Sequence, residues 1–105
     1  MKRYDGKIAV VTGASSGIGR RIALDRAARG AVVVGLARRE TLLEEICAGL
    51  QKMTQASETF VCDVSDTKQL RSRLVDIEER HGRIDILVNN AGVHEATSVS
   101  DDASF

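Results

Sequence analysis

The stretch Lys7-Ile-Ala-Val-Val-Thr-Gly-Ala-Ser-Ser-Gly-Ile-Gly19 joins a β-branched apolar run directly to a loop with three glycines. The apolar half is typical of a buried strand, and Ile18 to Arg29 have the pattern of a helix. Glycine at a strand-to-helix turn lets the backbone approach a ligand closely, and the start of the helix attracts an anion. The loop therefore favours a diphosphate ligand. The alternative is a glycine turn that only packs a helix against a strand.

The same alternation of apolar runs and amphipathic stretches continues along the chain. Strands are predicted over 31–37, 59–62 and 84–88, and helices over 40–52 and from the cap Ser65 to the residue before Gly82. Apolar strands separated by helices are typical of a parallel sheet covered on both faces. The predicted fold class is α/β: a doubly wound parallel sheet truncated to about four strands, order 3-2-1-4, with helices on both faces. Its fourth strand would be an unpaired apolar edge.

The composition excludes several classes of protein. The chain has 105 residues, with 15 Lys and Arg against 15 Asp and Glu, so its formal net charge is zero. Nucleic-acid and membrane-surface partners need clustered positive charge, and only three aromatic residues could stack on bases. Because no apolar run could span a bilayer or form a signal-peptide core, we expect a cytoplasmic protein. Cys47 and Cys62 are predicted to be buried thiols, since their spacing suits neither a metal site nor a disulfide scaffold.

Three motifs, each at the carboxyl end of an expected strand, carry a resemblance to a known family. Thr12-Gly-Ala-Ser-Ser-Gly-Ile-Gly19, Asp63-Val64 and Asn89-Asn-Ala-Gly92 resemble, in kind and in order, landmarks of the short-chain dehydrogenase/reductase family. The resemblance implies that residues 1–105 form a NAD(P)-binding Rossmann-type domain that is incomplete at its C-terminus. The local run Val33-Val-Gly-Leu-Ala-Arg-Arg39 also resembles an insect branch of the family described as farnesol-dehydrogenase-like.

The resemblance assigns three groups of residues to the cofactor. Those expected to wrap the diphosphate and the adenosine ribose are Gly13, Ser15, Ser16, Gly17, Ile18 and Gly19. The Asp63 carboxylate and the Val64 backbone would contact the adenine, although Asp63 also suits a turn before the next helix. The ribose and nicotinamide side would be lined by Asn90, Ala91 and Gly92.

Charge after the second strand favours NADP(H) over NAD(H). Folds of this kind that select NAD carry an acid about twenty residues beyond the glycine loop, bonded to the ribose 2′-hydroxyl. Here that region is Arg38-Arg39, and no acid lies between Asp25 and Glu40. Two guanidinium groups suit a 2′-phosphate, with Arg38 as the principal contact and Arg39 as the second. The alternative is that both arginines are solvated residues at the start of a helix.

The catalytic residues of the family have no counterpart in this sequence. In the family they are a Tyr-x-x-x-Lys pair with a Ser and an Asn. The only tyrosine here is Tyr4, and no lysine follows it at position 8, so no catalytic residue is assigned. No metal-binding residue is assigned either. His81 is expected to interact with a helix C-terminus, and His94 to be a bystander.

The resemblance nevertheless implies an activity for the intact parent. It would be an NADP(H)-dependent oxidoreductase acting on CH–OH groups, moving hydride between nicotinamide and a small-molecule alcohol or carbonyl substrate, and we expect it to be a homo-oligomer. This chain carries the cofactor-binding half, and we expect the 105 residues alone to be inactive. The alternative is a non-catalytic dinucleotide-binding protein or a truncated, inactive product.

Overall fold

The computed structural model describes residues 2–15, 17–89 and 92–95. Strands and helices alternate from β1 to β4, with bounds within two residues of those predicted, and a further strand, β5, follows β4 directly. The elements are β1 (Ile8–Thr12), α1 (Gly17–Ala28), β2 (Val32–Ala37), α2 (Glu40–Met53), β3 (Glu58–Val61), α3 (Thr67–His81), β4 (Ile86–Asn89) and β5 (Gly92–Glu95).

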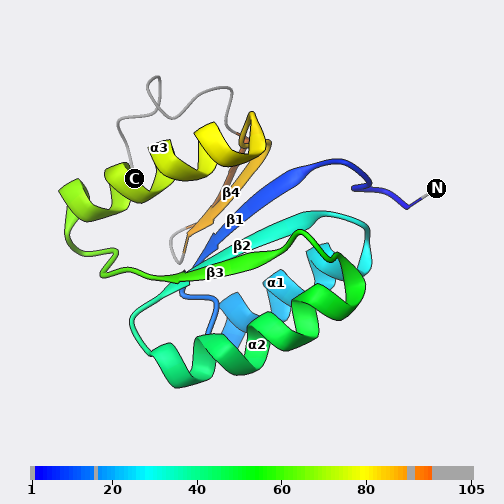
Figure 1. The fold of residues 1–105 in the computed structure, drawn as a ribbon, viewed down its shortest axis with the longest axis horizontal. Coiled ribbons are helices and arrows are strands. Elements are labelled where there is room, and N and C mark those ends of the chain that lie inside the picture. The colour runs from blue at the N-terminus through cyan, green and yellow to red at the C-terminus, as the bar shows by residue number, and fades with distance from the viewer. Residues whose placement is uncertain (1, 16, 90–91, 96–105) are drawn as a thin grey trace.

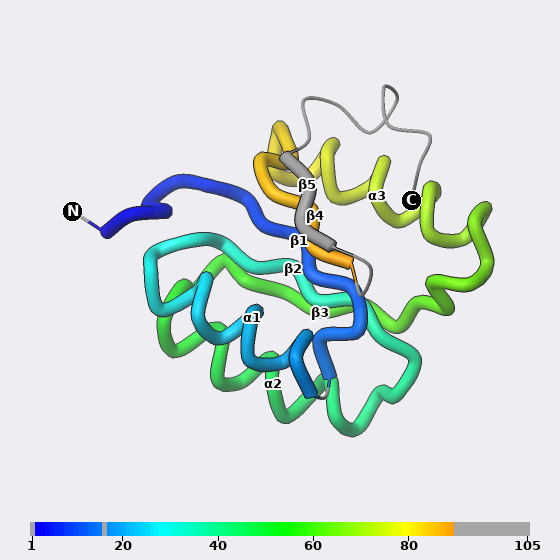
Figure 2. The backbone as a smooth tube through the Cα atoms, turned by 180° about the vertical axis from the view of Figure 1, so that it is seen from behind, coloured from blue at the N-terminus to red at the C-terminus, as the bar shows by residue number. Residues whose placement is uncertain are grey.

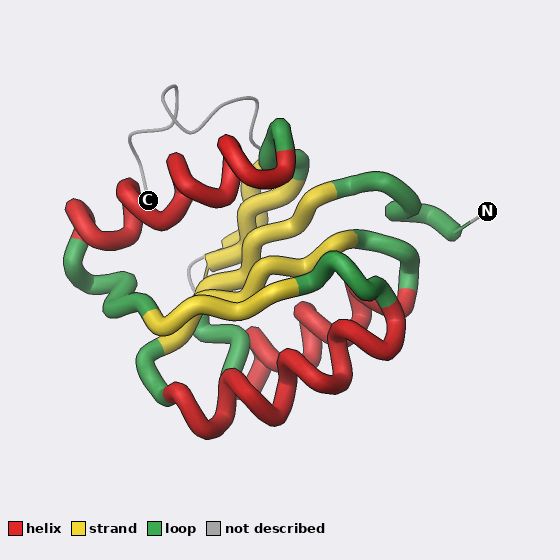
Figure 3. Tube along the Cα trace, viewed as in Figure 1, coloured by secondary structure: helices red, strands yellow, loops and turns green. Residues whose placement is uncertain are grey.

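The described strands form one sheet in the order β3-β2-β1-β4-β5, in which β1 to β4 run parallel (Figure 1). Helix α3 covers one face, while α1 and α2 cover the other (Figure 3). Viewed from behind, α1 and α2 lie side by side (Figure 2). This confirms the doubly wound parallel sheet with strand order 3-2-1-4 and helices on both faces.

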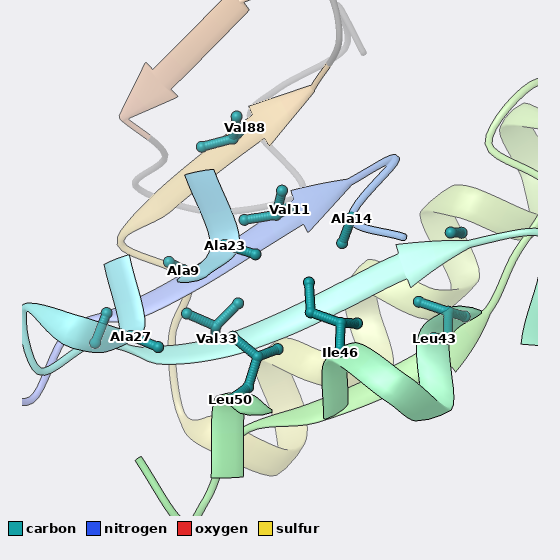
Figure 4. Close-up of a cluster of buried hydrophobic side chains, with 12 residues drawn as sticks. Ala9, Val11, Ala14, Ala23, Ala27, Val33, Leu43, Ile46, Leu50 and Val88 are labelled. Carbon is teal, nitrogen blue, oxygen red and sulfur yellow. The ribbon is translucent and has the colours of Figure 1, made fainter. Parts of the chain in front are cut away.

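The core has two halves because successive strand residues point to opposite faces of the sheet. In β1, Ala9 and Val11 belong to the cluster under α1 and α2, whereas Val10 belongs to the cluster under α3. Helix α2 contributes Leu43, Ile46 and Leu50 to the first cluster, at the spacing of one helical face (Figure 4). Both faces of the inner strands are therefore buried, as expected for a parallel sheet.

The expectation that the fourth strand is an unpaired edge is wrong. Strand β5 pairs with β4 in the antiparallel direction, with Val88 opposite Val93 and Asn89 opposite Gly92. The main-chain groups on the outer side of β4 are thus joined to a fifth strand, which removes the open edge on which the expectation rested.

The ends of α3 correct one prediction and confirm another. The N-terminal cap is Asp66, not Ser65: the Asp66 side chain accepts hydrogen bonds from the backbone N–H groups of Lys68 and Gln69, at 3.1 and 3.2 Å. Gly82 ends the helix in the left-handed conformation, as predicted. His81, which was expected to serve only the helix end, contacts Glu58 of β3, with 2.8 Å between Nε2 and Oε2.

Candidate cofactor-binding site

A cavity of about 510 Å³ lies where the carboxyl ends of β1, β2 and β3 meet. Parallel doubly wound sheets bind their ligands at this edge, and the volume is in the range of small-molecule sites. The side chains and backbone that line the cavity are those of Gly13, Ser15, Ala37, Arg38, Arg39, Cys62 and Val64. Two of them follow β1, three end or follow β2, and two follow β3.

The glycine loop is tied to the neighbouring strand by its own backbone. The N–H groups of Gly13 and Ala14 both donate to the carbonyl of Leu36 in β2, at 2.8 and 3.3 Å. The loop also lies directly against α1, because a Cβ atom added at Gly19 would be 2.1 Å from the carbonyl oxygen of Gly13. Glycine is therefore required at position 19 by the close approach of helix to loop, the role that a glycine also has in other dinucleotide-binding loops.

The other loop residues lie at the start of α1. Gly17 begins the helix with a positive φ of 58°, and the Ile18 side chain is 77% exposed. The first turn contains no acidic residue that would neutralise the positive end of the helix dipole. This arrangement suits an anion such as a diphosphate. Ser16, also expected at the diphosphate, lies outside the described residues.

Arg38 and Arg39 both line the cavity. Within residues 2–15 and 17–89, neither guanidinium group has a hydrogen-bond or ion-pair partner, unlike Arg26, Arg80 and Arg83. Arg39 is also the residue that caps α2, and its side chain makes no capping hydrogen bond. The positive charges and the start of α2 are thus available to an anion in the cavity. Glu40, the nearest acid in sequence, is absent from the cavity lining.

The segment after β3 contributes Cys62 and Val64 to the lining, whereas Asp63 between them does not line the cavity. Oδ1 of Asp63 accepts hydrogen bonds from the Ser65 hydroxyl at 2.6 Å and the Ser65 N–H at 3.0 Å. These bonds, with a smaller effect of the Arg38 charge, hold the pKa of Asp63 below its ordinary value. The alternative of a turn acid therefore describes Asp63 correctly, and a ligand role is compatible with it.

The predicted thiols differ in their surroundings. Cys62 is fully buried and Cys47 is half-buried, and both are free. Burial raises the pKa of the Cys62 thiol, so it lines the cavity as an uncharged group. Sequence reasoning overlooked Cys62 and Ala37 as lining residues, although their places at the ends of β3 and β2 were a usable signal.

The nicotinamide-side prediction falls largely outside the described residues. Asn90 and Ala91 are not described, and Gly92 is known only as the first residue of β5, opposite Asn89. Among the side chains that are described, no group of three or more His, Cys, Asp or Glu could hold a metal ion. No helix in the same part of the chain is both long and apolar enough to cross a membrane.

Comparison with known proteins places this geometry in a family. The sequence model of the short chain dehydrogenases matches residues 7–104. Over 100 residues the chain is 45% identical to a farnesol dehydrogenase of Aedes aegypti, and over 102 residues it is 37% identical to a 3beta-hydroxysteroid dehydrogenase of Mediterraneibacter gnavus. These alignments cover 94% and 97% of the chain but only 41% and 37% of the two relatives.

Solved structures give the same result. An NAD⁺-bound xylitol dehydrogenase superposes with a TM-score of 0.78 at 29% identity, and an actinorhodin polyketide ketoreductase with NADPH superposes with 0.75 at 34% identity. The matches cover 82% and 86% of this chain, and 33% and 34% of the solved chains. The glycine loop packed under α1, the cavity at the strand ends and these matches agree with one another: the chain belongs to the short chain dehydrogenase family.

Proposed function

We propose that this chain is the cofactor-binding part of an NADP(H)-dependent oxidoreductase that acts on an alcohol or carbonyl substrate. The observation that carries the proposal is the cavity at the carboxyl ends of β1, β2 and β3, which Arg38 and Arg39 line without a side-chain partner among the described residues. A cofactor bound there supplies hydride transfer through its nicotinamide ring. The protein binds and orients the cofactor.

The proposed cofactor contacts are those that the sequence predicts, and the positions of the described loop residues support part of them. The diphosphate would lie on Gly13, Ser15, Ser16 and the first turn of α1, which begins at Gly17 and includes Ile18 and Gly19. The adenine would lie against Val64, with Asp63 as hydrogen-bond acceptor. The ribose and nicotinamide would extend toward Asn90, Ala91 and Gly92.

The preference for NADP(H) rests on charge. A 2′-phosphate can form charge-assisted, bidentate hydrogen bonds with Arg38, and Arg39 adds a second positive charge at the start of α2. NAD selection would need an acid in this place, and among the described residues no acid lines the cavity. The similar solved proteins include one with NAD⁺ and one with NADPH, so the preference must come from the residues of this chain.

The substrate class is proposed from the relatives. They include dehydrogenases named for farnesol and for a 3beta-hydroxysteroid. An alcohol and its carbonyl partner are the substrates that a nicotinamide dehydrogenase interconverts. Self-association of the parent and a cytoplasmic location stay predictions.

The cofactor proposal is tested by titrating the 105-residue chain with NADPH and with NADH, and by repeating both titrations with Arg38→Asp. The wild-type chain should bind NADPH more tightly. Arg38→Asp should weaken NADPH binding roughly 10- to 100-fold, because a charge-assisted bond to phosphate is replaced by repulsion, and should leave NADH binding nearly unchanged. The matched control is Lys52→Asp, which makes the same change in charge at the far end of α2.

Three results would contradict the proposal. Tighter binding of NADH by the wild-type chain would reverse the cofactor preference. An unchanged affinity ratio in Arg38→Asp would show that Arg38 does not meet the 2′-phosphate. A shift of the ratio in Lys52→Asp would attribute the effect to net charge instead of to the cavity.

A further inference from the structure

Strand β3 lies at one edge of the sheet, and among the described strands it pairs with β2 alone (Figure 1). The N–H of Cys62 donates to the carbonyl of Ala37 in β2, so the main-chain groups of Cys62, and of Phe60 two positions earlier, are directed at β2. Main-chain groups alternate in direction along a strand, so those of Thr59 and Val61 are directed away from the sheet. The outer edge of β3 is therefore formed by the N–H and carbonyl groups of these two residues.

The outer edge is limited at both ends because the next outward groups are already bonded. The N–H of Ser57 donates to the carbonyl of Thr54 at 3.0 Å, and the N–H of Asp63 donates to Oε1 of Gln69 at 2.6 Å. The carbonyl groups of Ser57 and Asp63 each accept a hydrogen bond as well, both at 3.0 Å. The outward groups left for a partner strand are those of the two residues named above.

Strand β3 lacks the features that usually keep edge strands from pairing. The segment Glu58–Val61 contains neither lysine nor proline. Its one charged residue, Glu58, is bonded to Arg80 and His81 of α3. The Val61 side chain is 45% exposed. An apolar edge of this kind is a template for pairing with another strand.

A hollow of about 390 Å³ lies between β3 and α3. The residues that line it are Phe60 of β3 and Arg73, Asp76, Glu79 and Arg80 of α3. The guanidinium carbons of Arg73 and Arg80 lie 5.3 and 5.8 Å from the centre of the Phe60 ring, within the range of a cation–π contact. Two cations and two anions give the lining no net formal charge. It therefore does not attract a highly charged partner, and it does not repel a copy of itself.

We propose that the outer edge of β3 binds the same edge of a second copy of this chain, in an antiparallel pair centred on Phe60. About a two-fold axis at Phe60, Thr59 of each copy is opposite Val61 of the other, and each such pair exchanges both of its main-chain hydrogen bonds. This register uses every outward group. Moving the centre by one residue in either direction would place an outward group opposite Ser57 or Asp63, whose N–H groups are already bonded.

The side chains favour the same register. Glu58 is bonded to α3 and Phe60 packs against the cluster under α3, so both side chains lie on that face of the sheet. In the proposed pair, the two copies of Phe60 lie opposite each other at a non-hydrogen-bonded position, where Cα atoms are about 4.5 Å apart. Aromatic pairs in that arrangement stabilise neighbouring strands. The pair therefore joins main-chain bonds to an aromatic contact.

The test is a concentration series of the 105-residue chain by sedimentation velocity at neutral pH. The wild-type chain should show an equilibrium between monomer and dimer. Val61→Lys should raise the dissociation constant of the dimer roughly tenfold or more, because lysine on an edge strand opposes pairing. The matched control is Val75→Lys: Val75 is 41% exposed on α3 and does not line the hollow, so the dissociation constant should not change.

Phe60→Cys tests the register. The Cα separation of a non-hydrogen-bonded antiparallel pair is within the range that a disulfide spans, so oxidation with diamide should join two copies through position 60. The wild-type chain, in which Cys47 is half-buried and Cys62 is buried, measures the background. Val75→Cys is the control for an exposed thiol outside the pair and should not exceed that background.

Each outcome decides for or against the inference. A chain that stays monomeric at every concentration overturns it. A dimer that Val61→Lys leaves intact, that Val75→Lys weakens equally, or that gives no disulfide through position 60 overturns it as well. A dimer weakened by Val61→Lys alone and joined through position 60 supports it. None of these positions lines the cofactor cavity, so the result is independent of the proposed function.

Discussion

Gly19 is the residue at which the candidate site depends most directly on the absence of a side chain. A Cβ atom there would be 2.1 Å from the Gly13 carbonyl oxygen, a backbone atom that cannot move without moving the loop. We expect Gly19→Ala to lower the free energy of unfolding by about 1–3 kcal/mol and to weaken NADPH binding, because α1 must shift away from the loop. Urea unfolding and NADPH titration measure the two effects.

Gly49→Ala is the matched control for that substitution. Gly49 also lies inside a helix, but a Cβ there would be 3.6 Å from Cδ2 of Leu24, which is ordinary contact. This variant should gain about 0.5–1 kcal/mol through helix propensity and bind NADPH normally. If the two variants had equal free energies of unfolding, a methyl group at position 19 would be accommodated without loss of stability, which would contradict this prediction.

Residue-level prediction from sequence failed where two neighbouring side chains suited the same role. Ser65 and Asp66 are both good helix caps, and they are adjacent, so propensity alone does not choose between them. The structure resolves the choice through Asp63, whose carboxylate accepts the Ser65 hydroxyl and leaves Asp66 to cap α3. The sequence pattern alone does not show that the Ser65 hydroxyl is bonded to Asp63 and is therefore not used as the cap.

At the scale of elements, α3 is joined to the first residue of β3 by an ion cluster. Glu58 contacts Arg80 with 3.1 Å between Oε2 and Nε, and His81 with 2.8 Å between Oε2 and Nε2. Partial burial alone would raise the pKa of Glu58, but the bonds from Arg80 and His81 outweigh it and lower the pKa. The end of α3 is thereby fixed to the beginning of the strand whose other end borders the cavity.

We expect Glu58→Gln to lower the free energy of unfolding by about 1 kcal/mol, because it removes the charge from a cluster that is only partly exposed. Urea unfolding at neutral pH measures the loss. Glu45→Gln, an exposed site on α2, is the control and should change stability little. If the two variants were equally stable, the cluster would contribute nothing to the attachment of α3.

Sequence patterns predicted the elements that contain a β-branched apolar run or apolar residues at helical spacing. The β-branched runs and the helical spacing of Leu43, Ile46 and Leu50 placed β1, β2 and α2 within one residue of their observed bounds. Strand β5 was missed because Gly92–Glu95 is short and has no apolar run, and because its strand character comes from pairing with β4.

For the whole molecule, the carboxyls with lowered pKa predict acid sensitivity. Asp25, Glu58, Asp63 and Asp85 all titrate below their ordinary values in the folded chain. A carboxyl with a lower pKa in the folded than in the unfolded state stabilises the fold above its unfolded pKa, and this stability is lost as the pH falls through the folded pKa. The urea midpoint should therefore stay level near neutral pH and fall below about pH 4.

Asp85 provides the variant for that measurement. Burial alone would raise its pKa, but the N–H of Ile8 donates to Oδ2 at 2.8 Å, and Arg83 adds hydrogen bonds and charge, so the pKa is lowered. Asp85→Asn should be less stable at neutral pH and should lose less on acidification. A wild-type midpoint that does not change down to about pH 3 would contradict this prediction.

The topology of the molecule is what made the site predictable. Parallel strands bring their carboxyl ends to one edge, so residues after β1, β2 and β3 could be expected to gather there before any distance was known. Gly13, Ser15, Arg38, Arg39 and Val64 do line the cavity, whereas Asp63 is not part of the lining and its carboxylate accepts the Ser65 hydroxyl. Side-chain direction depends on such local bonds, and strand order does not determine it.

The bonds from Gly13 and Ala14 to the Leu36 carbonyl also have a kinetic consequence. This part of the loop takes its conformation from β2 and not from a ligand, so a ligand does not have to order it on arrival. Association should then be limited by the encounter of the dinucleotide with the open strand edge and accelerated by the positive charge of Arg38 and Arg39. Dinucleotides that differ in affinity should therefore differ mainly in their dissociation rates.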